Sequence, residues 1–199
     1  TGVRIRRWRN EIPNSLQNRL RITGNDLNDF ALSWAINSHK TNLPQYTENI
    51  EMNLDRYGSM AQRIPVDGIY FQKMDAKLAM ADASYQWIDI DPFGSPVAFI
   101  DSAIQSLARI GVLEVTATDT AALTGSSSSS QKRRYAAKGI VDDYAHDDAV
   151  RVLLGLIAKT AAMHDRVIKP ILALFDGHHV RVSVLVKSSK EEASNFQDN

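Results

Sequence analysis

The ten residues from 87 to 96, WIDIDPFGSP, constrain the fold of this chain more than any other stretch. Their apolar alternation stops at Asp91 and a Pro-Phe-Gly turn follows, which predicts a central strand that ends at an acid. Ser95 suits the N-cap of a helix and Pro96 its first position, where no helical carbonyl needs the missing N–H. Apolar residues then recur at helical spacing until Gly111, which we expect to end the helix.

Two carboxylates stand at the end of this predicted strand. Asp89 and Asp91 are two residues apart, so on a strand they point to the same side, roughly 6.5 Å from each other. A buried strand accepts an unpaired carboxylate only at a large free-energy penalty. One acid alone is compatible with a structural accident. An acid at the carboxyl end of a strand, followed by Pro-Phe-Gly, indicates a functional site.

Composition limits the classes of protein to which the chain can belong. Its 199 residues, 44% of them hydrophobic, suffice for one domain with a core. The 23 Lys and Arg balance 23 Asp and Glu, so a surface for nucleic acid has to be local. The absence of cysteine excludes disulfides, thiolate metal sites and cysteine nucleophiles, and it is typical of an intracellular protein. No apolar run in the sequence is long enough to cross a membrane.

The predicted elements alternate between strand and helix and end in a hairpin. Strands are expected over 19–23, 68–74, 87–91, 112–115, 168–175 and 180–186. The clearest helix covers 144–164, and the Asp-Gly pair at 176–177 is a strong turn signal between the last two strands. This order predicts an α/β fold with a mostly parallel, Rossmann-like sheet, helices on both faces and an antiparallel terminal hairpin. A nicotinamide-binding domain needs Gly-x-Gly-x-x-Gly in its first turn, and the sequence lacks this motif.

Two more acids follow predicted strands and precede predicted helices. Asp26 stands where nucleotide-binding α/β folds place the acceptor of the ribose hydroxyls, although a loop aspartate near a helix start, here capped by Asn28, is the plain alternative. The apolar face of that helix is expected at Ala31, Trp34 and Ala35. Asp75, followed by the small Ala76, resembles an adenine-binding turn, and a helix-capping aspartate is equally compatible with the sequence.

Four blocks of sequence, in this order, resemble the family of tRNA guanine-N2 dimethyltransferases that act at position 26 of tRNA. The blocks are NDLN at 25–28, IDIDPFGSP at 88–96, TATDTAALTG at 116–125 and RRYAAKG at 133–139. Asp-Pro-Phe also fits the pattern that closes the fourth strand of amino-group methyltransferases. The resemblance covers most of residues 1–187. It implies a class I methyltransferase fold, S-adenosyl-L-methionine as cofactor, tRNA as partner and N2,N2-dimethylguanosine as product.

The resemblance also implies roles for individual residues. In the reaction, the carboxylate of Asp91 and the carbonyl of Pro92 accept the two N–H groups of the guanine amine, while Phe93 stacks on the extruded base. The residues expected to bind the cofactor are Gly2, Arg4, Asp26, Asp75, Ala76 and Asp89. For Gly2 and Arg4 an ordinary basic helix is an equally good interpretation, because Ile5 stands where the family usually has glycine.

The third block and the basic run after it contain the residues that could contact the substrate. Asp119 either lines the pocket or satisfies loop amides, and we favour the structural role. Ser126–Ser130 is low in complexity and is expected to be mobile. The residues expected to bind RNA are Lys132, Arg133 and Arg134. A short basic run is otherwise a solvated face, but beside a base pocket it can hold phosphates.

The domain organisation follows from the same resemblance. Residues 1–187 are expected to form the catalytic domain, lacking its first strand and the segment upstream of it, and 188–199 a polar tail or linker to an absent carboxy-terminal domain. The polar stretch 41–67 is an insertion candidate with a helix near 48–57. We expect no metal, because neighbouring His178 and His179 on a strand point to opposite faces.

Two other functions stay open on the sequence alone. One is methylation of an amino group on another nucleic-acid base, and the other is a non-catalytic binding module with the same fold. The resemblance implies a cytoplasmic protein, or a nuclear or mitochondrial one in a eukaryote.

Overall fold

The computed structural model describes residues 2–17, 19–40, 64–66, 69–139 and 141–195. The chain divides into two compact units, Thr1–Ala79 and Met80–Asn199, with the division inside helix α4 (Ala76–Ala81). Each unit is described by itself below. The sequence predicted one catalytic domain over 1–187, and that statement stays a prediction. The helix expected near 48–57 lies outside the described residues.

The first unit contains a three-stranded sheet in the order β1-β3-β2. Strand β1 (Ile22–Asn25) runs parallel to β3 (Ile69–Gln72), and β2 (Ile64–Val66) pairs with β3 in the antiparallel sense. The helices that the structure describes in this unit ahead of α4 are α1 (Val3–Glu11), α2 (Asn14–Gln17) and α3 (Asp29–Lys40). The expected strand–helix alternation is therefore present here.

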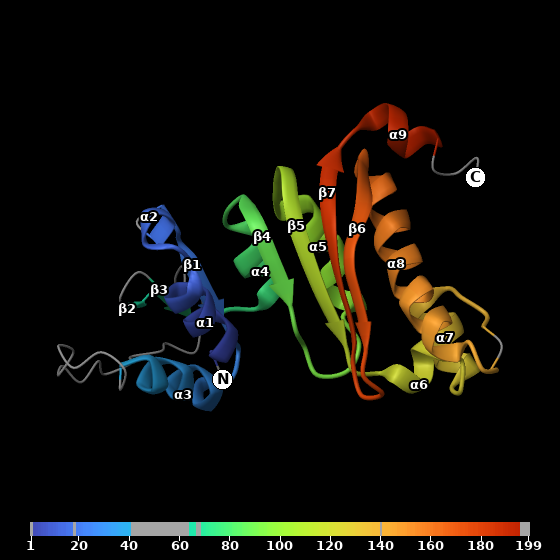
Figure 1. The fold of residues 1–199 in the computed structure, drawn as a ribbon, viewed down its shortest axis with the longest axis horizontal. Coiled ribbons are helices and arrows are strands. Elements are labelled where there is room, and N and C mark those ends of the chain that lie inside the picture. The colour runs from blue at the N-terminus through green and yellow to red at the C-terminus, as the bar shows by residue number, and fades with distance from the viewer. Residues whose placement is uncertain (1, 18, 41–63, 67–68, 140, 196–199) are drawn as a thin grey trace. The chain divides into compact units, whose positions relative to one another are not determined.

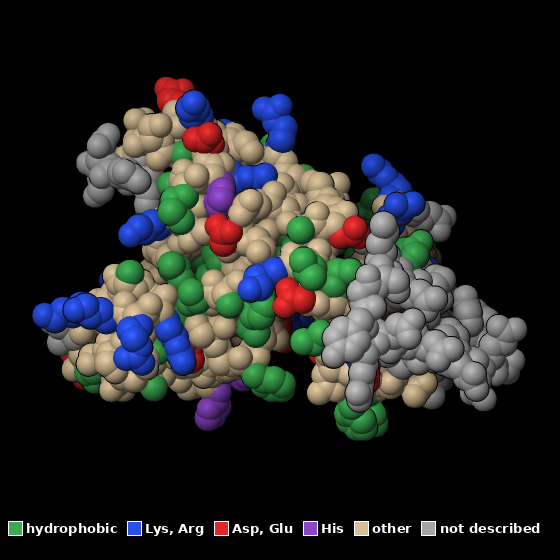
Figure 2. All heavy atoms as spheres, turned by 180° about the vertical axis from the view of Figure 1, so that it is seen from behind, with side chains coloured by type: hydrophobic (Ala, Val, Ile, Leu, Met, Phe, Trp, Pro, Cys, Tyr) green, Lys and Arg blue, Asp and Glu red, His purple; other side chains and the backbone are tan. Residues whose placement is uncertain are grey.

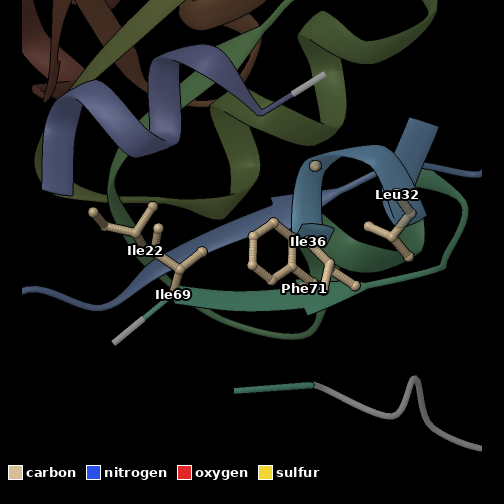
Figure 3. Close-up of a cluster of buried hydrophobic side chains, with 6 residues drawn as sticks. Ile22, Leu32, Ile36, Ile69 and Phe71 are labelled. Atoms are coloured by element: carbon tan, nitrogen blue, oxygen red, sulfur yellow. The ribbon is translucent and has the colours of Figure 1, made fainter. Parts of the chain in front are cut away.

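The core of the first unit is a cluster of aliphatic and aromatic side chains from α3, β1 and β3 (Figure 3). The buried side chains of α3 are Leu32, Ala35, Ile36 and His39. They recur at i, i+3, i+4 and i+7, the spacing of one helix face. The expected face was wrong for Trp34, which is 55% exposed, because two residues along a helix turn the side chain about 200° away from Leu32.

The second unit contains a four-stranded sheet in the order β4-β5-β7-β6 (Figure 1). Its strands are β4 (Tyr85–Ile90), β5 (Leu107–Ala117), β6 (Arg166–Phe175) and β7 (Val180–Ser188). Strands β4 and β5 are parallel, and β7 is antiparallel to both β5 and β6. Within this sheet β4 is an outer strand, whereas the sequence predicted a central one.

The described helices after β4 in the second unit are α5 (Val97–Ser106), α6 (Thr120–Leu123), α7 (Ser128–Tyr135), α8 (Ala145–Met163) and α9 (Lys190–Asn195). Helix α5 packs on β4 and β5, and α8 packs on β6 and β7 and against α5. The predictions for α8 and for the terminal hairpin are confirmed. Among the described residues no helix is long and apolar enough to span a membrane.

Helix α5, which follows the Pro-Phe-Gly turn, ends earlier than expected. Helix α5 stops at Ser106, and β5 begins at Leu107, so Gly111 is a strand residue and not a helix cap. A Cβ on Gly111 would lie 2.9 Å from Leu107 Cδ2 and 3.1 Å from the carbonyl oxygen of Gln86. The glycine therefore serves the close approach of two strands, a use that periodicity alone does not distinguish from a helix end.

Two segments expected to lack regular structure are helical. In the serine-rich segment, α7 is anchored by Gln131, whose side chain donates to the carbonyl of Leu123 at 3.1 Å and accepts from the N–H of Gly139 at 2.7 Å. In the polar tail, Ser189 and Glu192 bond to each other at the start of α9, as in a capping box, and Ala193 is buried. Bonds to other segments therefore hold α7, whereas α9 is stabilised by its own cap and by the burial of Ala193.

Candidate active site

The candidate catalytic residues form a turn directly after β4. Asp91 and Phe93 are exposed, Phe93 completely, and Pro92 is half-buried. Gly94 adopts φ 80°, in the left-handed region, with no atom within 4 Å of the place where a Cβ would be. Glycine is thus required there for its backbone conformation and not for space. The turn presents an acid and an aromatic ring side by side in sequence at the carboxyl end of a strand.

Thr118, one residue past β5, holds this turn through Gly94. The N–H of Gly94 donates to Thr118 Oγ1 at 2.6 Å, and the N–H of Thr118 donates to the carbonyl of Gly94 at 2.9 Å. Both backbone groups of the left-handed residue are therefore bound to one partner. Thr118 lies within the TATDTAALTG block, but no feature of the sequence indicates this role for it.

Behind the turn, Asp119 is the centre of a second set of contacts. Its Oδ1 accepts from the hydroxyl of Tyr135 at 2.6 Å, and its Oδ2 lies 3.0 Å from Nη1 of Arg134. The Tyr135 oxygen also lies 3.1 Å from Ser95 Oγ. Since the phenolic proton goes to Asp119, Ser95 is the donor in that bond. Burial, and after it the bond to Asp119, raise the pKa of Tyr135, which therefore stays a neutral donor at physiological pH.

These contacts account for two of the predictions. Both oxygens of Asp119 bind side chains of α7, which is a structural role, although the partners are not the loop amides that we expected. Ser95 was expected to cap α5, but the residue at the N-cap position is Pro96, without a side-chain bond. The hydroxyl of Ser95 instead binds Tyr135, forty residues later in the chain.

The basic run forms the last turn of α7. Lys132, Arg133 and Arg134 are exposed, and basic side chains gather over this helix in Figure 2. Arg134 forms the ion pair with Asp119 described above, and Arg133 contacts Ser130 Oγ at 3.4 Å. Cations at the carboxyl end of a helix are also stabilised by its dipole. The role of these residues in RNA binding stays a prediction.

Asp89 lies inside the sheet and forms an ion pair. Its Oδ1 is 3.1 Å from Nη1 of Arg181 on β7, which also donates to Thr116 Oγ1 at 2.6 Å. Nη2 of the same arginine binds Glu114, and Ser183 Oγ donates to that glutamate at 2.9 Å. The structure thus provides Asp89 with a cation that the sequence did not reveal. Its expected contact with the cofactor stays a prediction.

In the first unit, Asp26 and Asp75 follow the parallel neighbours β1 and β3 at the same edge of the sheet. Oδ1 of Asp26 accepts the N–H of Asn28 at 2.8 Å. Oδ1 of Asp75 accepts the N–H groups of Lys77 and Leu78 at the start of α4, the capping role left open by the sequence. Each carboxylate uses only one oxygen for these bonds. Both acids are therefore compatible with a local structural role and with a ligand at Oδ2.

An orphan acceptor lies at this same edge. Asn25, the last residue of β1, donates its side-chain N–H to the carbonyl of Met74 at 2.9 Å. Its Oδ1 is buried and accepts no hydrogen bond within the part of the chain that the structure describes. A buried amide oxygen without a donor is costly, and a ligand carrying a hydroxyl or amine would satisfy it.

Gly2 and Arg4, the first two residues of the expected cofactor-binding set, lie at the start of helix α1. Gly2 adopts φ 72° as the N-cap of α1, and a Cβ there would lie 2.8 Å from Cβ of Ala35. Ile5 packs against the core cluster, and its Cδ1 occupies the space next to Gly24. Arg4 is half-buried. The structure has both a left-handed glycine at position 2 and a basic helix after it, so it does not separate the two interpretations, and contacts of Gly2, Arg4 and Ala76 with a cofactor stay predictions.

Comparisons with known proteins give the same assignment over the whole chain. The family model described as N2,N2-dimethylguanosine tRNA methyltransferase matches residues 1–199. Among curated proteins, the tRNA (guanine(26)-N(2))-dimethyltransferase of Thermoplasma acidophilum is 36% identical over 150 residues, 75% of this chain and 41% of that protein. The one from Thermoplasma volcanium is 40% identical over 116 residues, 58% of this chain and 34% of that protein.

A solved structure is also similar. Trm1 from Pyrococcus horikoshii, in complex with S-adenosyl-L-methionine, is 29% identical with a TM-score of 0.80. The match covers 98% of this chain and 50% of that one. The present chain thus spans half or less of the length of these relatives.

Proposed function

The chain belongs to the N2,N2-dimethylguanosine tRNA methyltransferase family, and on this premise we propose that it carries the methyl-transfer site of an enzyme acting on guanine N2 at position 26 of tRNA. Its α/β fold, with mostly parallel strands and an antiparallel terminal hairpin, is that of class I methyltransferases. The observation that carries the proposal is the Asp91–Gly94 turn, which presents a carboxylate and a fully exposed ring at the end of β4.

The substrate explains why an acid is needed at Asp91. The exocyclic nitrogen of guanine is a weak nucleophile because its lone pair is delocalised into the ring. Asp91 and the Pro92 carbonyl each accept one N–H, which favours a tetrahedral nitrogen and aims its lone pair. The carboxylate also stabilises the positive charge that develops on nitrogen during the transfer. Proline fixes the turn so that the two acceptors converge.

Phe93 supplies a stacking platform for the base. A base inside a folded tRNA has to leave its stack before a side chain can reach its amine. The fully exposed ring of Phe93 has no described side chain covering it and is available for stacking. A second methylation at the same nitrogen needs no further residue, only room for the first methyl group.

The cofactor that we propose is S-adenosyl-L-methionine, which when bound supplies a methyl group on a positively charged sulfur. The acceptors at the ends of β1 and β3 fit its hydroxyls and amine: Asp26 for the ribose, Asp75 for the exocyclic amine of adenine, and the orphan Oδ1 of Asn25 beside them. Gly2, Arg4, Ala76 and Asp89 complete the proposed cofactor-binding set.

The cofactor assignment predicts the effect of replacing Asp26 by alanine. Loss of a charged acceptor for the ribose should weaken S-adenosyl-L-methionine binding by about 1–3 kcal/mol, measured by titration calorimetry. Asp29, which pairs with Lys73 at 2.6 Å on the surface, provides the matched control: Asp29→Ala should leave affinity unchanged. Equal affinity of the Asp26 variant and the unaltered protein contradicts the ribose assignment.

The catalytic assignment is tested by Asp91→Asn in the natural full-length protein. The amide keeps the shape of the side chain but replaces a charged acceptor, so kcat should fall at least about a hundredfold, or about 2.7 kcal/mol, at unchanged melting temperature. Asp143, an exposed acid of the same unit, serves as control through Asp143→Asn. Turnover is measured by methyl transfer to tRNA with nucleoside analysis of the product.

The products separate this function from its two alternatives. N2,N2-dimethylguanosine at position 26 supports the proposal, a methylated amine on another base supports a different nucleic-acid substrate, and cofactor binding without any product supports a binding module. We place the protein in a compartment that contains tRNA: the cytoplasm, or the nucleus or mitochondrion of a eukaryote.

A further inference from the structure

The Asp91–Ser95 turn is held in place by residues that follow β5 and by helix α7. The first contact point is a pair of hydrogen bonds between Gly94 and Thr118: the Gly94 N–H donates to the side-chain hydroxyl of Thr118 at 2.6 Å, and the Thr118 N–H donates to the Gly94 carbonyl at 2.9 Å. The N–H of Gly94 belongs to the same planar peptide unit as the carbonyl of Phe93. Fixing this N–H therefore orients the peptide plane that follows Phe93, one of the two planes that flank the residue carrying the ring.

The second contact point is one residue later. The Ser95 hydroxyl donates to Tyr135, whose own proton goes to Asp119. Tyr135 is only 4% exposed, and the Asp119 carboxylate is held from its other oxygen by Arg134. Thr118 and Asp119 are neighbours in sequence, so one short segment after β5 binds the turn directly and also through a buried tyrosine.

The two contact points act on the adjacent residues Gly94 and Ser95. No atom lies within 4 Å of the Cβ position of Gly94, Phe93 is fully exposed, and Ser95 does not cap α5. Side-chain packing at Phe93 and Gly94 is therefore slight, and the two bonds to Thr118 are the hydrogen bonds that hold Gly94. A displacement of about 1 Å of a reacting group can reduce a rate about a hundredfold.

We propose that Thr118 and Tyr135 are positioning residues that hold the Asp91–Ser95 turn in the geometry needed for methyl transfer. They touch neither the base nor the cofactor and act through Gly94 and Ser95. The inference rests on the proposed function, since the rate that the turn controls is that of the reaction proposed above. Its structural part, the bond from Gly94 to the Thr118 hydroxyl, can be measured without any activity.

The test compares Thr118→Val with Thr118→Ser in the natural full-length protein. Valine keeps the shape of threonine but removes the acceptor of the Gly94 N–H, whereas serine keeps the hydroxyl and removes only a methyl group. We expect kcat to fall by about tenfold to a hundredfold in Thr118→Val and to stay within about threefold in Thr118→Ser, with the KM for S-adenosyl-L-methionine unchanged in both. Tyr135→Phe should lower kcat in the same direction at unchanged KM.

Thr160→Val is the matched control. Thr160 is 7% exposed and its hydroxyl donates to the carbonyl of Leu156 within α8 at 2.8 Å, so the same substitution removes a buried hydroxyl far along the chain from the turn. It should leave kcat unaltered. The second readout is the exchange of the Gly94 amide proton with solvent, followed by nuclear magnetic resonance. This proton should be protected in the unaltered protein and in Thr118→Ser, and exposed in Thr118→Val.

The outcomes distinguish this inference from the proposed function. If the unaltered protein forms no dimethylguanosine, the proposed function fails, and the Gly94 exchange still decides whether Thr118 holds the turn. If the unaltered protein is active, full kcat in Thr118→Val or in Tyr135→Phe overturns the inference. Equal loss in Thr118→Ser and Thr118→Val also overturns it, because packing of the methyl group would then be responsible. If Thr118→Val fails to fold, Tyr135→Phe and the Gly94 exchange in Thr118→Ser decide.

Discussion

Replacing Arg181 by methionine is expected to destabilise the second unit by about 3 kcal/mol. Removing one partner of a buried ion pair typically costs about 3–5 kcal/mol, because a charge is left without compensation. The side chains of Arg181, Asp89 and Glu114 are 22%, 11% and 15% exposed, so partial hydration places the cost at the lower end of that range. Asp89 and Glu114 are also register partners on β4 and β5, so the variant leaves two like charges opposite each other.

Native-state hydrogen exchange of the amides in β5 and β7 measures this loss. The slowest amides of these paired strands report the free energy of opening the sheet, independently of the first unit. Arg109→Met, on an exposed residue of the same strand β5, is the control and should change the free energy by no more than about 0.5 kcal/mol. A loss below about 1 kcal/mol in the Arg181 variant would refute the reasoning.

A second substitution, Glu114→Gln, tests whether the loss of this acid changes from destabilising to stabilising once Arg181 is absent. Alone, Glu114→Gln removes the charged acceptor of Arg181 and should destabilise by about 1–3 kcal/mol. In the Arg181→Met background the same change removes an uncompensated charge and should be neutral or stabilising. Such a reversal is the signature of direct coupling. Simple addition of the two losses would mean that the three charged groups act separately.

Two further predictions concern the terminal hairpin and the basic helix. The N–H groups of His179 and His178, with the His179 ring, hold the pKa of Asp176 at about 2, below its usual 3.8. The lowered pKa means that the turn is stabilised above about pH 4 and loses this contribution as the pH falls through 2, which amide exchange of the two histidines should follow. Combined replacement of Lys132 and Arg133 by alanine should weaken tRNA binding in the full-length protein and reduce its salt slope by about 1–2, measured by filter binding at several salt concentrations. An unchanged slope would place the phosphate contacts elsewhere.

Elements specified by local sequence could be predicted in detail. The apolar spacing of α8 and the Asp-Gly turn between β6 and β7 operate within a few residues, and the structure follows both. The cap of α3 is similarly local: Asn28 Oδ1 accepts the N–H groups of Phe30 and Ala31 at 2.9 and 3.2 Å. In each of these elements the interaction that fixes the element lies within the element or next to it.

Errors arose where a distant contact competes with a local preference. The serine-rich segment was expected to be mobile, yet Gln131 and Tyr135 anchor it as a helix through bonds to other segments. Glycine commonly ends a helix, but Gly111 lies in β5 and allows the close approach of two strands. Ser95 has the propensity of an N-cap, and its hydroxyl binds Tyr135 instead. Intrinsic propensity describes the local conformational preference of a residue and does not include its contacts with distant parts of the chain.

The two acids of the DID sequence illustrate this limit on predicting a site. Both were singled out because a carboxylate in a strand is costly, and that reasoning assumed that no cation was near. Arg181 on β7, 92 residues after Asp89, forms an ion pair with Asp89 and neutralises its charge. Asp91 lies one residue beyond the end of β4 and is exposed. Position relative to the hydrogen-bonded part of the strand therefore separates the two: an acid inside the sheet requires a structural partner, whereas an acid just past its end can meet a substrate.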